Sequence, residues 1–94
     1  MILQIIKLKS NLEEEELIKR AKLRAPQFES IPGLIQKYYS KMGDGSYAGV
    51  YIWDSQASIV KFKESELAKS IPAAYEIIEA PDIEILDILF QLRE

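Results

Sequence analysis

Cysteine and histidine are both absent from the sequence. Without cysteine the chain has no disulfide framework and no thiolate catalysis, which is compatible with a reducing cytoplasm, where we expect the protein to act. Without histidine it lacks the usual general base at neutral pH and the commonest metal ligand. We therefore expect no metal site, and any acid–base chemistry must use other side chains.

Long hydrophobic runs are also missing. The first residues are rich in Ile and Leu, but the run is short and no small-residue cleavage site follows it, which favours a first strand over a signal peptide. No segment is long enough to span a bilayer, so we expect no membrane partner. A net charge of −3 argues against a broad nucleic-acid-binding face. A length of 94 residues predicts a single domain, 1–94.

The apolar pattern predicts alternating strands and helices. Strands are expected at 2–9, 34–42, 47–53 and 82–91. After the first strand, a helix is expected, because its apolar residues have helical spacing: Leu17, Ile18, Ala21, Ala25 and Phe28. A second helix is expected at about 55–63, capped by Asp54 or Ser55, and short helical turns at 65–78 are interrupted by Pro72. The order β-α-β-β-α-β is the ferredoxin-like α+β pattern with a four-stranded antiparallel sheet.

Two local features refine the first helix. Ser10 or Asn11 is placed to cap it, with Glu13 or Glu14 positioned for a capping box. Pro26 is expected to disturb the helix near its end, because proline removes a hydrogen-bond donor.

Both faces of the predicted sheet are apolar, although one domain has helices for only one face. In the last strand, one set of alternating residues is Ile83, Ile85 and Leu89, and the other is Leu86, Ile88, Phe90 and Leu92. An uncovered apolar face marks an interface. The sequence therefore predicts a homodimer in which two sheets pack face to face around a shared, barrel-like core.

The second and third strands are separated by Gly-Asp-Gly-Ser at 43–46. With Asp44 and Gly45 as a two-residue turn, Tyr38 lies opposite Tyr51, and directly opposed residues share a face. One face then carries Tyr38, Tyr47, Tyr51 and Trp53 around Gly49, which has no side chain. Lys37 and Lys41 fall at the rim of the dimer face. A one-residue bulge would exchange part of this assignment.

The aromatic row has two interpretations that the sequence leaves open. The rings either form the core under the helices or line a small-molecule pocket made by Trp53, Tyr51 and Tyr38, with space at Gly49. RNA-recognition domains share the element order and stack bases on strand aromatics. Here the ring spacing differs and no basic residue precedes Tyr47, so we expect no nucleic-acid partner.

Other polar residues also have alternative roles. Tyr75 either closes over the pocket or packs against the sheet edge. Arg24 is expected to be solvated near a helix C-terminus. Asp87 interrupts an apolar strand, and we expect it to pair with Lys7 or Lys37 across the sheet, a role as catalytic base being the alternative.

Several segments together resemble a known family: "IPGLIQKYY", "AGVYIWDSQAS", "ELAKSIPAAYE" and "PDIEILDI". In this order they resemble the dimeric α/β-barrel proteins, and most closely the small bacterial branch named for monooxygenase activity and related to the antibiotic-biosynthesis monooxygenases. The resemblance implies a homodimer with one pocket per subunit between sheet and helices. It also implies an oxygenase that uses no metal or flavin cofactor and acts on a small aromatic or quinol-like molecule.

The resemblance also bears on single residues. Trp53 stands at the end of the third strand, where relatives carry a functional Trp. The candidate catalytic residues are therefore Trp53, Tyr51 and Tyr38, and Gly49 and Tyr75 join them as ligand-binding residues. No His follows the third strand, which argues against haem degradation through a His ligand, and no general base is assigned. The alternative is a homodimer of the same fold that binds a small ligand, or has a structural role, without catalysis.

Overall fold

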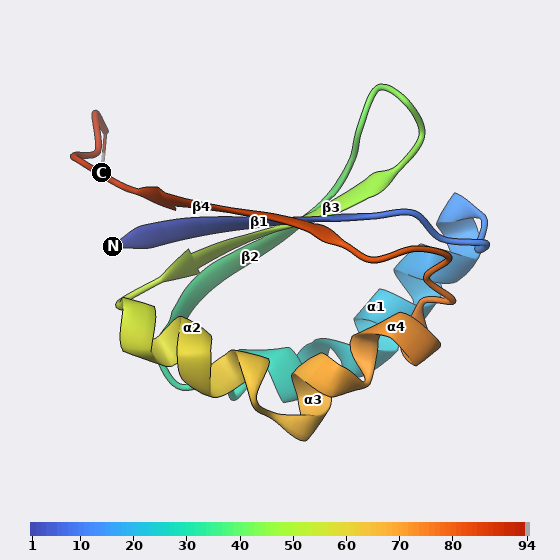
Figure 1. The fold of residues 1–94 in the computed structure, drawn as a ribbon, viewed down its shortest axis with the longest axis horizontal. Helices are drawn as coiled ribbons and strands as arrows, with labels where there is room; N and C mark the ends of the chain where they lie inside the picture. Colours follow the sequence, from blue (N-terminus) through green and yellow to red (C-terminus); the bar gives the residue numbers. More distant parts are fainter. Residues whose placement is uncertain (94) are drawn as a thin grey trace.

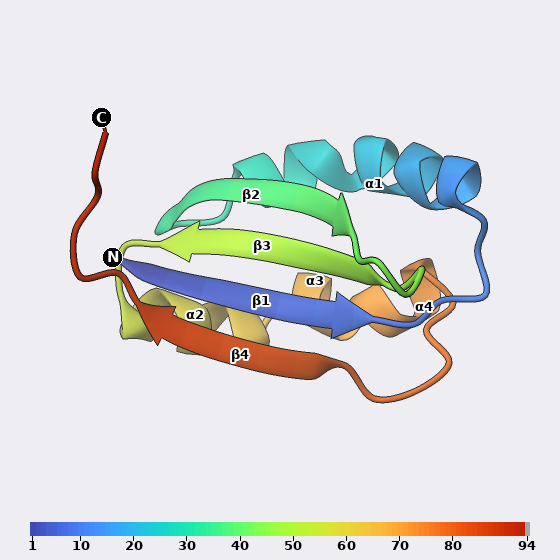
Figure 2. The same ribbon diagram turned by 90° about the horizontal axis from the view of Figure 1, so that it is seen from above.

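The structure is a computed structural model, and it describes residues 1–93. Within them, four strands form an antiparallel sheet in the order β2-β3-β1-β4 (Figure 1; Figure 2). The strands are β1 (Ile2–Leu8), β2 (Leu34–Lys41), β3 (Tyr47–Trp53) and β4 (Asp82–Asp87). The helices are α1 (Glu14–Glu29), α2 (Gln56–Lys63), α3 (Glu66–Lys69) and α4 (Ile71–Ala74). The predicted ferredoxin-like α+β fold is confirmed.

All four helices lie on one side of the sheet (Figure 1). The core forms between this face and the helices, where Tyr51 and Trp53 of β3 meet Phe28 of α1 and Phe62 of α2. These side chains face the helices because alternate residues of a strand point the same way. The opposite face of the sheet is open among the described residues.

The first helix begins differently from the prediction. Glu13 is its N-cap and makes no side-chain capping bond. Ser10 does not cap the helix, because its hydroxyl donates to the carbonyl of Tyr75 and accepts the Leu12 N–H at 3.0 Å. Pro26 lies within α1, and the helix continues for three residues beyond it. The second helix is as expected, since the Ser55 side chain accepts from the N–H of Ser58.

The hairpin between β2 and β3 corrects the predicted register. Its loop has three residues, 43–45, between Met42 and Ser46. The Met42 N–H donates to the Ser46 carbonyl at 2.7 Å. Gly45 takes a positive φ of 89°, as the last residue of a three-residue hairpin loop commonly does. Lys41 therefore pairs with Tyr47, and the pairing is displaced by one residue along β2.

From Gln36 onward this displacement exchanges the two faces of β2, whereas a bulge between Leu34 and Gln36 keeps Leu34 opposite Trp53 on the helix-facing side. Lys37 lies opposite Tyr51, and Tyr39 lies opposite Gly49, so both face the helices. Tyr38 lies opposite Val50 on the open face and is 56% exposed. Placing Tyr38 in the aromatic row, and Lys37 and Lys41 at the rim of the dimer face, was therefore wrong, because Lys41 lies opposite Tyr47 on the helix-facing side as well.

The last strand is shorter than predicted. It ends at Asp87, because Asp87 pairs with Ile2, the first residue of β1. Beyond this pair, the Ile88 N–H donates to the Met1 carbonyl at 3.1 Å. Residues 89–91 therefore have no strand to pair with. Lys7 forms its ion pair with Glu84 at 3.4 Å, and not with Asp87 as expected.

The segment after β4 is apolar and exposed. Leu89, Phe90 and Leu92 are 80–90% exposed, and the segment leaves the sheet on the side away from the helices (Figure 1). On the open face, Tyr38 and Leu86 are also exposed. The predicted apolar character of this second face is confirmed, although Lys7 and Glu84 lie on it as well.

Candidate functional site

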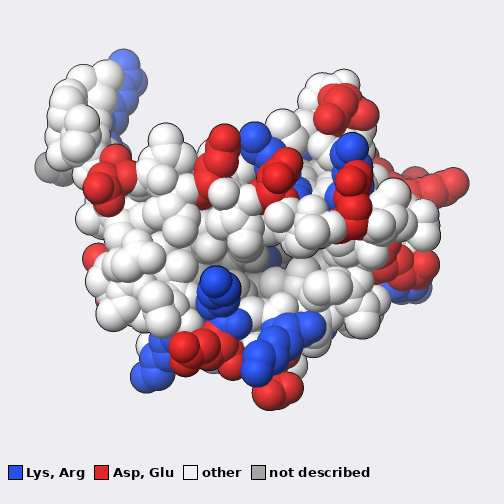
Figure 3. Space-filling model, viewed as in Figure 1, with Lys and Arg blue, Asp and Glu red and all other residues white. Residues whose placement is uncertain are grey.

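A cavity of about 240 Å³ lies between the sheet and the helices α1 and α4. Its floor comes from β1, β2 and β3, and its far wall from Leu17 and Ile18 of α1 and Ile71 of α4. In Figure 3 the molecule is hollowed between the sheet and the helices, and uncharged atoms surround most of the hollow. A largely apolar concave site with a few polar groups is typical of small-molecule binding.

Tyrosines form much of the cavity wall. Tyr39, Tyr47, Tyr51 and Tyr75 all line it, together with Gly49. A side chain at Gly49 would meet the Tyr51 ring, since a Cβ there would lie 3.0 Å from Tyr51 Cε1. Gly49 therefore lets the Tyr51 ring lie across β3. Of the sequence-predicted site residues, Tyr51, Gly49 and Tyr75 are thus brought together at the cavity.

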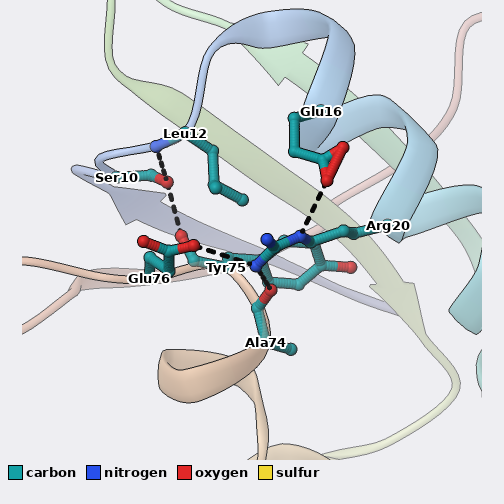
Figure 4. Close-up of polar contacts among 7 residues, drawn as sticks. All are labelled: Ser10, Leu12, Glu16, Arg20, Ala74, Tyr75 and Glu76. Carbon is teal, nitrogen blue, oxygen red and sulfur yellow. Dashed lines mark hydrogen bonds and ion pairs between the residues drawn. The ribbon is translucent and has the colours of Figure 1, made fainter.

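Tyr75 is held in place through its backbone (Figure 4). Its carbonyl accepts from Ser10, and the neighbouring Ala74 carbonyl accepts from Arg20 Nη1 at 3.0 Å. Arg20 also pairs with Glu76 at 3.2 Å, which ties the end of α4 to α1. The Tyr75 side chain is 4% exposed, and its buried hydroxyl makes no hydrogen bond within the described part of the chain.

The cavity contains one lysine in an aromatic setting. Lys37 Nζ lies 3.6 Å from the centre of the Phe28 ring, 4.3 Å from the centre of the Tyr39 ring and 4.6 Å from the centre of the Tyr51 ring. Burial, and secondly the Arg24 guanidinium, lower the pKa of Lys37 to about 7. Ring faces still attract an ammonium, so Lys37 exists in both charge states near neutral pH. Such a side chain can accept a proton.

Arg24 is not the solvated residue expected from the sequence. Its Nη2 donates to Ser70 Oγ at 2.8 Å, and its guanidinium lies 5.7 Å from the Tyr75 ring and 5.9 Å from the Phe28 ring. Its buried Nε has no partner among the described residues. Arg24 thus places a fixed positive charge behind the wall that carries Lys37 and Tyr75.

The hydroxyls of Tyr39, Tyr51 and Tyr75 remain protonated at neutral pH. Tyr39 is 46% exposed, and its partial burial raises its pKa to about 12, with Tyr75 adding to the effect and Arg24 opposing it. Burial likewise raises the pKa of Tyr51 and of Tyr75. Neutral phenols donate hydrogen bonds, so the cavity can stabilise an oxyanion that develops on a bound molecule.

The opposite end of the cavity carries an ion pair. Lys41 Nζ lies 2.7 Å from Glu14 Oε1, and both residues line the cavity. The hydrogen bond to Glu14 and its charge raise the pKa of Lys41. The two lysines of the cavity therefore differ: Lys41 is a paired ammonium, whereas Lys37 has no carboxylate partner among the described residues.

Trp53, the main candidate from the sequence, is not among the residues that line the cavity. It is 0% exposed, and its Nε1 donates to Gln4 Oε1 at 2.9 Å. Its ring is stacked on that of Tyr51, with 5.9 Å between the ring centres and 6° between the ring planes. The centre of the Phe62 ring lies 5.4 Å from that of Trp53. Trp53 thus fills the core behind Tyr51. Tyr38, on the open face, does not line the cavity either.

Lys37 is the residue that the sequence interpretation missed as part of the cavity. The usable signal was the loop 43–45, since a three-residue loop puts Lys37 on the face of Tyr51.

Among residues 1–93, no group of three Asp, Glu, His or Cys side chains could hold a metal ion. No helix in that part of the chain is long and apolar enough to cross a membrane.

No protein-family model and no curated protein matches the sequence. Solved structures do match the fold. SnoaB from Streptomyces nogalater, described as a cofactor-independent oxygenase, is 12% identical with a TM-score of 0.77, over 99% of this chain and 97% of SnoaB. A Caulobacter crescentus protein, named as a candidate antibiotic biosynthesis monooxygenase, is 22% identical with a TM-score of 0.75, over 95% of this chain and 90% of that protein.

A third match is a mutant of MhuD with two manganese protoporphyrin IX molecules bound per active site. It is 16% identical, with a TM-score of 0.78 over the whole of both chains. At these identities the likeness concerns the fold. The chain therefore has the ferredoxin-like fold seen in structures of antibiotic biosynthesis monooxygenases.

Proposed function

We propose that the cavity is the active site of a cofactor-independent oxygenase that acts on a small aromatic or quinol-like molecule. The observation that supports this most directly is Lys37, which lines a largely apolar cavity and whose pKa is lowered to about 7 by burial and by Arg24. A general base works best when its pKa is close to the working pH. The shared fold with SnoaB, described as a cofactor-independent oxygenase, points in the same direction.

The cavity volume limits the size of the substrate. At about 240 Å³ it is larger than a cavity of roughly 150 Å³, which can hold benzene. It is smaller than the range of about 300–1,000 Å³ that is usual for drug-sized ligands. A molecule of one to three fused rings fits this range best, part of it extending toward solvent.

The residues divide the chemistry between them. Neutral Lys37 accepts a proton from an acidic O–H or C–H of the substrate, which becomes an electron-rich anion. The hydroxyls of Tyr39 and Tyr75 donate to the oxygen on which the negative charge gathers. The anion then reacts with O₂, and at a CH₂ group the products are a carbonyl and one water. One oxygen atom enters the product and the other leaves in the water.

Oxygen uptake with anthrone and substituted hydroquinones tests this function. We expect uptake above the uncatalysed rate, and ¹⁸O from labelled O₂ in the anthrone product. Lys37→Met should lower kcat by roughly 100-fold or more, the usual contribution of a general base. Lys61→Met, on the exposed surface of α2, is the matched control and should keep full activity.

The opposite result would favour the second function. If aromatic molecules quench Tyr and Trp fluorescence by binding, but neither oxygen uptake nor product appears, the protein is a non-catalytic ligand-binding protein of this fold. Lys37→Met would then change affinity alone.

We also propose that the protein is a homodimer through the open face of the sheet. Tyr38 and Leu86 are exposed there, and Leu89, Phe90 and Leu92 extend from the same side. A second copy would cover these apolar side chains. Light scattering after size exclusion should give twice the chain mass at micromolar concentration. Leu86→Glu together with Tyr38→Glu should shift the protein to a monomer, and a wild-type monomer at that concentration would contradict the proposal.

A further inference from the structure

The surroundings of Lys37 suit a second kind of chemistry. Its Nζ is bordered by three ring faces, those of Phe28, Tyr39 and Tyr51, at 3.6–4.6 Å. None of the five ion pairs among residues 1–93 includes it. The nearby fixed charge, Arg24, has the same sign. The ring faces attract the ammonium, whereas loss of water and the neighbouring cation favour the uncharged amine, which is the nucleophilic form.

Lys41 provides a comparison within the same cavity. It lies four residues further along β2, on the same face, but it is exposed and bonded to Glu14 at 2.7 Å. At neutral pH Lys41 is an ammonium, which has no free electron pair to attack with. The structure therefore distinguishes the two lysines chemically, although both line the cavity.

We propose that Lys37 forms an imine with a small aldehyde or ketone bound in the cavity. The Nζ electron pair attacks the carbonyl carbon, and the carbonyl π pair takes up a proton to give a carbinolamine. The carbinolamine then loses its hydroxyl as water, the nitrogen loses a proton, and a C=N bond remains. The balance is one amine and one carbonyl compound giving one imine and one water.

The cavity supplies what these steps need. The buried Tyr75 hydroxyl makes no hydrogen bond among the described residues, although the Arg24 side chain lies beside it, so it can give a proton to the carbonyl oxygen and take one back. Apolar walls such as Ile71 and Leu17 limit the water that would hydrolyse the imine. A protonated imine withdraws electrons from the neighbouring carbon. This reaction therefore extends beyond oxygenation and requires no O₂.

Reductive trapping tests the proposal. The whole protein is incubated without oxygen at pH 7.5 with 4-hydroxybenzaldehyde and cyanoborohydride, which gives a hydride to the imine carbon and leaves a stable secondary amine. We expect one adduct per chain by intact mass, and peptide mapping should place it on Lys37. Its formation should be at least about 30-fold faster than on Lys41, since far more of the Lys37 amine is neutral at this pH.

The pH profile provides a readout that needs no variant. Labelling of Lys37 should reach half its maximum near pH 7, whereas labelling of Lys41 should still rise at pH 9. Lys37→Arg keeps the charge and should remove the adduct. Adducts spread over the surface lysines, or a Lys37 profile that follows that of Lys41, would overturn the proposal. Because oxygen is absent, trapping succeeds or fails independently of the oxygenase activity.

Discussion

Replacing Trp53 by alanine is expected to lower the free energy of unfolding by about 3–5 kcal/mol, the usual cost of removing a fully buried aromatic side chain. The ring is 0% exposed and packs against those of Tyr51 and Phe62. Its loss also leaves the buried Gln4 amide without its 2.9 Å partner, which adds to the cost. Urea denaturation of the two proteins, compared at one protein concentration, measures the difference.

Tyr38→Ala is the matched control, since Tyr38 was the other aromatic candidate of the sequence. It is more than half exposed on the open face, so at a protein concentration low enough to keep the chain monomeric its truncation should change the free energy of unfolding by less than about 0.5 kcal/mol. Trp53→Phe retains most of the packing and should leave ligand affinity within about 3-fold. A Trp53→Phe protein that is stable but no longer binds aromatic ligands would mean that Trp53 is a ligand-binding residue after all.

The different outcomes for Trp53 and Lys37 show how far the sequence could go. Element order and apolar alternation were sufficient for the fold, because they depend on periodicity that survives errors of one residue. The contents of the cavity depend on the register of one hairpin. Gly-Asp-Gly at 43–45 is compatible with a loop of two residues or three, and that choice decides whether Lys37 or Tyr38 faces the helices.

Burial distinguishes the two interpretations, core or pocket, that the sequence left open for Trp53. The sequence places Trp53 on the helix-facing side of β3, and this is confirmed. Whether it lines a cavity or fills the core depends on its neighbours. Gln4, on the adjacent strand, gives the indole N–H a partner inside the core, and Phe62 of α2 packs against the ring. Neither contact is local in sequence, so periodicity could not reveal them.

The same long-range dependence applies to the charge of Lys37. A lysine in an alternating strand has no sequence signature of a lowered pKa. The change comes from Phe28 and Arg24 of α1, which pack over it. The residue with the most useful chemistry in the cavity is therefore defined by tertiary contacts alone.

This charge should be visible in the stability of the fold. Between about pH 7 and 10 the folded chain has released the Lys37 proton that the unfolded chain still binds, because the pKa falls from 10.5 to about 7 on folding. Stability rises with pH wherever the unfolded state binds more protons. From pH 7 to pH 9 the free energy of unfolding attributable to Lys37 should therefore increase by about 2 kcal/mol.

Other shifted groups act outside this window. Tyr39, Tyr51 and Tyr75 have raised pKa values, so they reduce stability only where unfolded phenols ionise, near pH 10 and above. Asp44 and Asp54 have lowered pKa values and matter only in acid. The rise between pH 7 and 9 can thus be assigned to one amine.

Urea denaturation at pH 6, 7, 8 and 9, at one fixed protein concentration, measures the effect. Lys37→Met should remove the rise and should be more stable than the wild type at pH 6, where the wild-type chain keeps a poorly hydrated ammonium. Lys41→Met should retain the rise, since the pKa of Lys41 is raised and not lowered. Parallel curves for the wild type and Lys37→Met would mean that Lys37 stays charged in the folded protein. Both its roles, as base and as nucleophile, would then fail together.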